Sequence, residues 1–199
     1  MNLTEEFLDN VKNHKLKILL DNGVYRHLRF QAPETSNRYF EIVTYPGYLV
    51  ICGDMGTYVF KRLTDMFEFF RHDTVDLDYW SQKIDAEDKG SKVKEFSQEK
   101  SEKCILEIIN DYFYDGETEE SKKQVLSEED EAERTRVLEL FNDLNFDCEE
   151  DLRNEVEEIN SECFNNFWEV SLKDYTFRFI WCCQAIVWAV KQWDAREKV

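Results

Sequence analysis

The acidic residues of this chain are so numerous and so spaced that their carboxylates could act together on a ligand. Residues 101–170 contain 23 Asp and Glu against 6 Lys and Arg, which accounts for −17 of the chain's net charge of −18. On a helix, carboxylates four residues apart lie about 6 Å from each other on one face. Duplex DNA carries one negative charge per ~1.7 Å of its axis. Rows of such carboxylates could therefore present a phosphate-like field to a protein that binds nucleic acid. The candidate partner-binding residues are Glu117, Glu119, Glu120, Glu128, Glu129, Asp130, Glu131, Glu133, Glu149, Glu150, Asp151, Glu155, Glu157 and Glu158.

The same acidic segment has a plainer interpretation. Charged runs on helices usually form a solvated face that keeps a protein in solution. Six basic residues cannot neutralise 23 acidic ones by pairing along a helix, so self-repulsion should cost stability. Partner binding and plain solvation both remain open. No stretch fits the spacing of a calcium-binding loop, and no His lies at metal-ligand spacing from a Cys, so we expect no metal and no cofactor.

A second set of candidates lies in the N-terminal segment and comprises Arg26, His27, Arg29, Arg38 and Asp54. In an extended strand His27 and Arg29 share one face, whereas Arg26 lies on the other. A sheet face with cations and tyrosines can stack bases and contact phosphates, so a nucleic-acid-binding or catalytic module centred on this sheet is an alternative function. The plain interpretation is a polar outer face, with Asp54 serving a turn between two glycines.

Signatures of catalysis do not stand out in the sequence. No Ser or Cys occurs in a nucleophile elbow, and no glycine-rich phosphate loop is present. We therefore expect no catalytic residue and a protein that is not an enzyme. The net charge of −18 also opposes direct binding of nucleic acid, because long-range repulsion hinders the approach of phosphates.

The elements that position these residues change character along the chain. Between residues 15 and 61, short apolar or alternating runs are separated by turn sequences such as Asn22-Gly23, which predicts four or five antiparallel strands. Thereafter the apolar period becomes helical. We expect short helices after Thr64 and over 78–84, and a charged loop over 85–95. Longer helices should follow over 97–114, after Ser127, around 152–159, and from 175 to about 198 with Asp174 as the cap.

This order of elements predicts an α+β fold, in which an N-terminal antiparallel β-sheet is followed by a helical C-terminal half. We expect a sheet-containing part over residues 1–84 and an acidic helical part over 96–199, packed together as one or two small domains. The final helix is apolar on most of its surface. We therefore expect it at the centre of the fold, covered by both the sheet and the amphipathic helices.

The cysteines and the N-terminal residues indicate a compartment. The six cysteines form no Cys-x-x-Cys pair, and the start MNLTEEFLDNV lacks the basic and apolar regions of a secretory signal. Reduced thiols in a cytosol are the simplest interpretation. The apolar run Phe179–Val190 is shorter than the ~20 residues that a membrane span needs. We expect a cytoplasmic protein that does not contact a membrane.

Two segments carry a resemblance. The block Tyr25–Arg71 contains YFEIVTYPGYLVICGDMGTYVFKRLTDMFEFFR, and the C-terminal region contains FRFIWCCQAIVWAVKQWDA. Together they resemble a family of small phage- and prophage-encoded proteins of uncharacterised function. The resemblance spans most of the chain and transfers no catalytic residue. It implies a phage accessory protein that acts in the host cytoplasm, a context in which small acidic inhibitors of host defence, including anti-CRISPR and anti-restriction proteins, are a recurring class.

These observations favour a phage-encoded, non-enzymatic inhibitor. It would bind a host protein that handles nucleic acid, such as a defence effector, nuclease or restriction component, through an acidic helical surface that mimics nucleic acid. A further alternative is a structural phage protein that forms a homo-oligomer, with a homodimer as the simplest case. Trp80, Trp168 and Trp193 lie outside the densest apolar run and could provide its interface.

Overall fold

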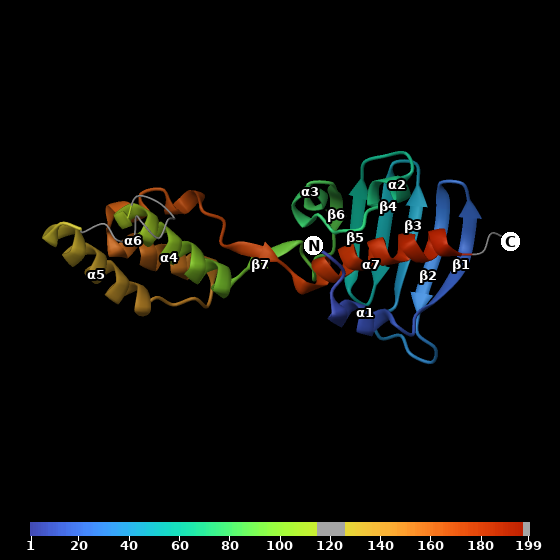
Figure 1. Cartoon of the computed structure of the whole chain (residues 1–199), viewed down its shortest axis with the longest axis horizontal. Coiled ribbons are helices and arrows are strands. Elements are labelled where there is room, and N and C mark those ends of the chain that lie inside the picture. Colours follow the sequence, from blue (N-terminus) through green and yellow to red (C-terminus); the bar gives the residue numbers. More distant parts are fainter. Residues whose placement is uncertain (115–125, 197–199) are drawn as a thin grey trace. The chain divides into compact units, whose positions relative to one another are not determined.

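The computed structural model describes residues 1–114 and 126–196, which form two compact units (Figure 1). The first unit combines residues 1–94 with residues 175–199, and the second unit comprises residues 95–174. The second unit is thus an insertion into the first. This division differs from the expected one, 1–84 and 96–199, because the C-terminal helix belongs to the same unit as the N-terminal sheet.

A six-stranded antiparallel sheet forms the centre of the first unit, with its strands side by side in chain order. The strands are β1 (Lys15–Asn22), β2 (Tyr25–Gln31), β3 (Phe40–Tyr45), β4 (Tyr48–Gly53), β5 (Gly56–Lys61) and β6 (Ile84–Glu87). The sheet confirms the predicted α+β fold and has one strand more than expected. The extra strand, β6, lies where a short helix and a loop were expected. Its sequence, IDAE, alternates between apolar and polar residues but is only four residues long and runs into a charged segment. Its pairing with β5 places it in the sheet.

Two glycines in the turns of the sheet need backbone conformations that other residues rarely adopt. Gly23, between β1 and β2, has φ +63°, as the predicted Asn22-Gly23 turn requires. Gly53 has φ +152°, and a Cβ atom there would lie 2.3 Å from the carbonyl oxygen of Tyr39. Any other residue at position 53 would therefore strain the hairpin that carries Asp54.

One face of the sheet packs against α7 (Phe177–Ala195), which runs across the strands in Figure 1. Buried residues alternate along the strands, as Leu28 and Phe30 do in β2, because successive side chains point to opposite faces. The Phe40 and Trp181 rings meet edge to face at 5.6 Å. Three short helices, α1 (Glu5–Val11), α2 (Met66–Phe70) and α3 (Leu77–Ser81), contribute further buried side chains to this core.

Helix α7 differs in two respects from the expected final helix. Thr176, not Asp174, is its N-cap, because the Thr176 hydroxyl accepts a hydrogen bond from the Phe179 backbone N–H at 3.2 Å. Its buried side chains belong to the core of the first unit alone. The expectation that the acidic helices also cover it was wrong, because those helices bury their apolar stripes against one another.

A buried polar residue marks the middle of α7. The Gln184 side chain is only 3% exposed, and its Oε1 accepts hydrogen bonds from the backbone N–H and the hydroxyl of Thr4. Thr4 in turn caps α1. Gln184 thus satisfies a backbone donor at the start of α1 that has no partner within that helix. None of the helices in the described ranges combines the length and the apolar character needed to cross a membrane.

The second unit is helical and has a core of its own. It contains α4 (Gln98–Tyr114), α5 (Glu128–Asn142), α6 (Glu149–Ile159) and two short 3-10 helices, η2 (Glu162–Phe164) and η3 (Phe167–Glu169). Their buried apolar residues form one cluster, which comprises Ile105, Ile109, Phe113, Val137, Leu152, Val156, Ile159, Phe164, Phe167 and Leu172. The chain enters through β7 (Lys94–Phe96) and leaves through β8 (Lys173–Tyr175), which pair with each other.

Candidate functional site

The net charge of the protein lies entirely in the second unit. Residues 95–174 contain 26 Asp and Glu against 8 Lys and Arg, a net charge of −18. The first unit contains 17 acidic and 17 basic residues and is formally neutral. The acidic block of the sequence therefore belongs to one compact unit with its own apolar core, which makes the surface of that unit the first candidate site.

The starts of α5 and α6 explain why acidic residues gather there. The Ser127 hydroxyl accepts a hydrogen bond from the Asp130 backbone N–H, which caps α5 as predicted. Cys148 caps α6 in the same way, with its Sγ 3.4 Å from the Asp151 nitrogen. Carboxylates in the first turn of a helix interact favourably with the helix dipole. The sequence places four of them at the start of α5 and three at the start of α6.

Some of the candidate carboxylates are engaged within the unit. Glu133 forms two hydrogen bonds of 2.8 Å with Arg136, and this guanidinium holds the pKa of Glu133 below its usual value. Glu149 contacts Arg153 in α6, and the hydrogen bond from Arg153 likewise lowers the pKa of Glu149. Glu155 accepts a hydrogen bond of 2.6 Å from the Asn145 backbone. These contacts hold the helices and the loop between them in place.

Seven other candidates are exposed and have no hydrogen bond or ion pair through their carboxylates within the described residues. They are Glu128, Glu129, Glu131, Glu150, Asp151, Glu157 and Glu158. A further candidate, Asp130, is exposed and accepts a hydrogen bond of 2.6 Å from the Ser127 hydroxyl. The remaining candidates, Glu117, Glu119 and Glu120, lie outside the described residues. The seven carboxylates are available to an external cation.

Part of this acidic surface is concave. A hollow of about 490 Å³ lies where α4, α5 and η2 meet, and its lining includes Glu129, Asp130, Glu133 and Glu162. Arg136 also lines it, but its guanidinium is held by Glu133 and by the Ile159 carbonyl at 3.1 Å. The hollow therefore presents more carboxylate than cationic groups to the solvent.

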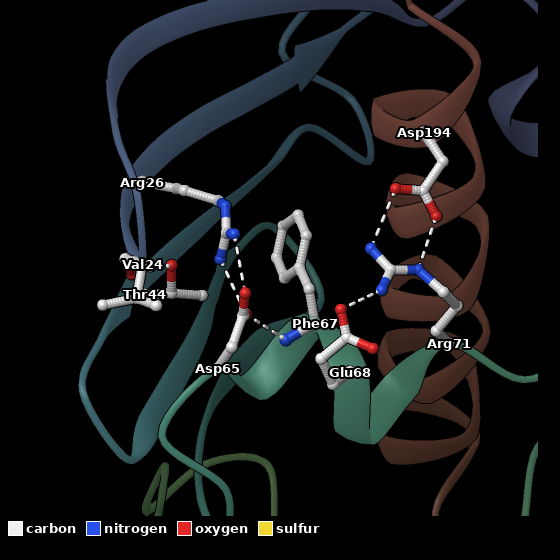
Figure 2. Close-up of polar contacts among 8 residues, drawn as sticks. All are labelled: Val24, Arg26, Thr44, Asp65, Phe67, Glu68, Arg71 and Asp194. Carbon is white, nitrogen blue, oxygen red and sulfur yellow. Dashed lines mark hydrogen bonds and ion pairs between the residues drawn. The ribbon is translucent and has the colours of Figure 1, made fainter.

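Arg26, from the alternative site on the sheet, is buried at the core face and is not available to a ligand (Figure 2). Its guanidinium forms two hydrogen bonds of 2.8 Å to Asp65 and lies 4.5 Å from the centre of the Phe67 ring. Asp65 also accepts a hydrogen bond from the Phe67 backbone N–H and so caps α2. The hydrogen bond from Arg26 lowers the pKa of Asp65. Arg26 therefore joins β2 to α2.

A second arginine shown in Figure 2 also has a structural role. Arg71, just after α2, donates hydrogen bonds of 2.8 and 3.0 Å to the two carboxylate oxygens of Asp194 in α7. It also contacts Glu68. These acids raise the pKa of Arg71, with its hydrogen bonds to the Asp194 carboxylate as the main cause. The arginine links the end of α2 to the last turns of α7.

His27 and Arg29 lie together on the opposite face of the sheet, away from α7. Both contact the Glu41 carboxylate, at 2.6 Å from the His27 Nε2 and 3.0 Å from the Arg29 Nη1. The Arg29 guanidinium also lies 4.9 Å from the centre of the Tyr39 ring. One carboxylate thus partly offsets the positive charge on which the alternative function depends.

Asp54 and Arg38 meet through the backbone. The Asp54 carboxylate accepts a hydrogen bond of 2.8 Å from the Arg38 backbone N–H, and Arg38 has a left-handed φ of +56°. His14 donates to the Arg38 carbonyl at 2.9 Å. Asp54 therefore holds the loop before β3 in place. The five candidates on the sheet are divided between its two faces and this loop, and do not converge on one point.

The three tryptophans proposed for an oligomer interface have different environments. Trp80 and Trp193 are 1% and 5% exposed, so the expectation that they could form an interface was wrong. Both pack against phenylalanines of α2, which bury them in the core of the first unit. Trp168 is 73% exposed. It stands beside a hollow of about 450 Å³ in the second unit, which the sequence analysis did not find. The sequence feature that could have indicated this hollow is the pair of adjacent aromatic residues Phe167 and Trp168, which follows two asparagines.

Among residues 1–114 and 126–196, no group of three or more His, Cys, Asp or Glu side chains is arranged to hold a metal ion. The geometry thus offers an acidic surface on the second unit, and on the sheet a set of charged groups that contact one another. Comparison with family models, with curated proteins and with solved structures found no match to this chain.

Proposed function

We propose that this protein is a phage-encoded, non-enzymatic inhibitor that acts in the host cytoplasm. It binds a host defence protein that handles nucleic acid, and its contact surface is the acidic face of α5 and α6. The observation that carries the proposal is the separation of charge: the second unit has a net charge of −18 and the first unit has none. The resemblance to phage-encoded proteins supplies the biological context.

The mechanism is electrostatic competition. Carboxylates of α5 and α6 form ion pairs with the Arg and Lys side chains that the host protein otherwise uses to bind phosphates. The seven unpaired carboxylates support this role, because each can form a charge-assisted hydrogen bond without giving up a contact within the protein. Association driven by such a field is fast and weakens steeply with salt.

The experiment that tests this proposal is a charge reversal with a matched control. Glu128→Lys with Glu129→Lys reverses two exposed first-turn carboxylates of α5. Glu5→Lys with Glu6→Lys makes the same change in the first turn of α1, in the neutral unit. Both variants alter the charge and the helix dipole interaction equally. The tagged proteins are used to capture host proteins, which are then identified and challenged with duplex DNA.

We expect the wild-type protein to capture a host protein that binds nucleic acid and that duplex DNA displaces. The α5 variant should no longer capture this host protein, whereas the α1 variant should still capture it. Equal capture by the two variants would reject the acidic surface as the contact site. Capture of nucleic acid by the protein itself would instead favour the sheet, and Arg29→Ala would then be the first variant to examine.

A further inference from the structure

We propose that the hollow beside Trp168 binds an arginine side chain of the partner protein. This inference rests on the function proposed above and names the chemistry that the partner must present. The hollow has a volume of about 450 Å³. Its lining includes the apolar side chains of Val156, Phe164 and Phe167 and the polar or aromatic side chains of Glu157, Asn160 and Trp168.

The hollow forms because the chain turns sharply after α6. Asn160 ends that helix in a left-handed conformation, with φ +51°, which asparagine tolerates better than most residues. The two 3-10 helices that follow bring Phe164 and Phe167 into the core, where their rings meet edge to face at 5.9 Å. Trp168, next in the chain, is 73% exposed and has no ring contact within the described residues. An apolar floor therefore lies beside an unpaired indole.

The charges around the hollow favour a cation. Arg153 also lines it, but its guanidinium donates to the carbonyls of Phe167 at 3.1 Å and Val170 at 2.8 Å and pairs with Glu149 at 2.9 Å. The charge of Arg153 is thus compensated. Glu157 is exposed, and its carboxylate has no partner among the described residues. The surrounding unit adds its net charge of −18.

Arginine fits this lining better than lysine does. A guanidinium is planar, stacks on aromatic rings and offers five N–H donors, whereas an ammonium is a strongly hydrated point charge. In the hollow, the Trp168 indole provides the flat surface for stacking, and the Glu157 carboxylate can accept a pair of N–H groups. The side-chain oxygens of Asn160 and Asn165, which also line the hollow, are further acceptors.

The test uses the full chain and a fluorescent hexa-arginine peptide, with binding followed by anisotropy at physiological ionic strength. Trp168→Ala should weaken binding about tenfold through loss of the stacked cation. Glu157→Gln should weaken it about threefold through loss of one ion pair. Glu139→Gln is the matched control for charge, because Glu139 is exposed on α5 and does not line the hollow. Phe177→Ala controls for the loss of an exposed aromatic ring in the first unit.

The inference is supported when Trp168→Ala and Glu157→Gln weaken binding of the peptide and the two controls do not. Equal binding by wild type and Trp168→Ala, with circular dichroism showing both folded, would overturn it. Equal weakening by Glu157→Gln and Glu139→Gln would also overturn it, because only total charge would then matter. A hexa-lysine peptide with the same affinity and the same sensitivity to Trp168→Ala would overturn the assignment to arginine.

These outcomes are separable from failure of the proposed function. If Glu128→Lys with Glu129→Lys leaves host-protein capture unchanged while Trp168→Ala weakens peptide binding, arginine binding in the hollow beside Trp168 is supported and the α5 contact surface is rejected. If Trp168→Ala does not change peptide binding while the α5 variant no longer captures the host protein, the acidic contact surface is supported and arginine binding in the hollow is rejected.

Discussion

The guanidinium of Arg26 and the carboxylate of Asp65 meet through two hydrogen bonds of 2.8 Å, across 39 positions of sequence. This pair connects the second strand of the sheet to the N-terminus of α2, whose cap is the same Asp65. The side chain of Arg26 is 10% exposed and that of Asp65 is 25% exposed. Arg26 is therefore part of the folded framework, although its residue type suggested a phosphate contact.

We expect Arg26→Ala to lower the free energy of unfolding by about 2–3 kcal/mol, because removal of one partner leaves a carboxylate in a largely buried position. The figure is below that for a fully buried pair, since Asp65 is partly solvated. Urea denaturation measures the change. Arg29→Ala is the control, because Arg29 is exposed to a greater extent, and we expect it to cost less than about 1 kcal/mol. Similar losses for both variants would contradict the structural role of Arg26.

The same pair predicts a dependence of stability on pH. Arg26 lowers the pKa of Asp65 in the folded protein below its ordinary value of 3.8. Because the folded pKa is lower than the unfolded one, the contribution of Asp65 to stability is fully present above about pH 4 and is lost as the pH falls through the folded pKa. Urea denaturation of wild type and Asp65→Asn at neutral and acid pH should show the two stabilities converging at low pH. A constant difference between them would contradict this prediction.

Salt should act differently on the two units. The second unit has a net charge of −18, so its carboxylates repel one another, and added salt screens that repulsion. We therefore expect sodium chloride to slow hydrogen exchange in α5 and α6 and to change exchange in the neutral first unit much less. Hydrogen exchange measured by mass spectrometry separates the units, because each gives its own peptides. Equal protection of both units by salt would contradict the prediction.

Gly53 should be among the least replaceable residues of the sheet. A Cβ atom at this position would lie 2.3 Å from the Tyr39 carbonyl oxygen, and φ is +152°. We expect Gly53→Ala to reduce the free energy of unfolding by about 2–4 kcal/mol. Gly90→Ala is the control, because its new Cβ would approach nothing closer than 3.6 Å. We expect that variant to stay within about 0.5 kcal/mol of wild type, as thermal unfolding can show.

Several features of the fold could be predicted from the sequence because they depend on neighbours along the chain. The Asn22-Gly23 turn, the alternation of β2 and the Ser127 cap of α5 each result from local backbone preferences or side-chain periodicity. The concentration of negative charge in one segment is likewise a property of the sequence. These local signals were sufficient for the α+β class and for most of the acidic candidate surface.

Other features depend on contacts between distant residues, and only the tertiary structure decided them. β6 is a strand because β5 offers it an edge to pair with, whereas its own four residues are too few to predict a strand. Helix α7 could have packed against either the sheet or the acidic helices, and the complementary apolar face of the sheet determined the outcome.

The tertiary structure also decided which individual side chains are buried and which are exposed. The sequence did not distinguish Trp80, Trp168 and Trp193, which all lie outside the densest apolar run. Packing against α2 buries Trp80 and Trp193, whereas Trp168 is exposed beside a hollow of the second unit. Arg26 became structural because the fold brought Asp65 within 2.8 Å. The sequence by itself thus determined where the charge lies and which local elements form. The tertiary structure decided which charges and aromatic rings remain available to a partner, because burial and pairing depend on residues far apart in the chain.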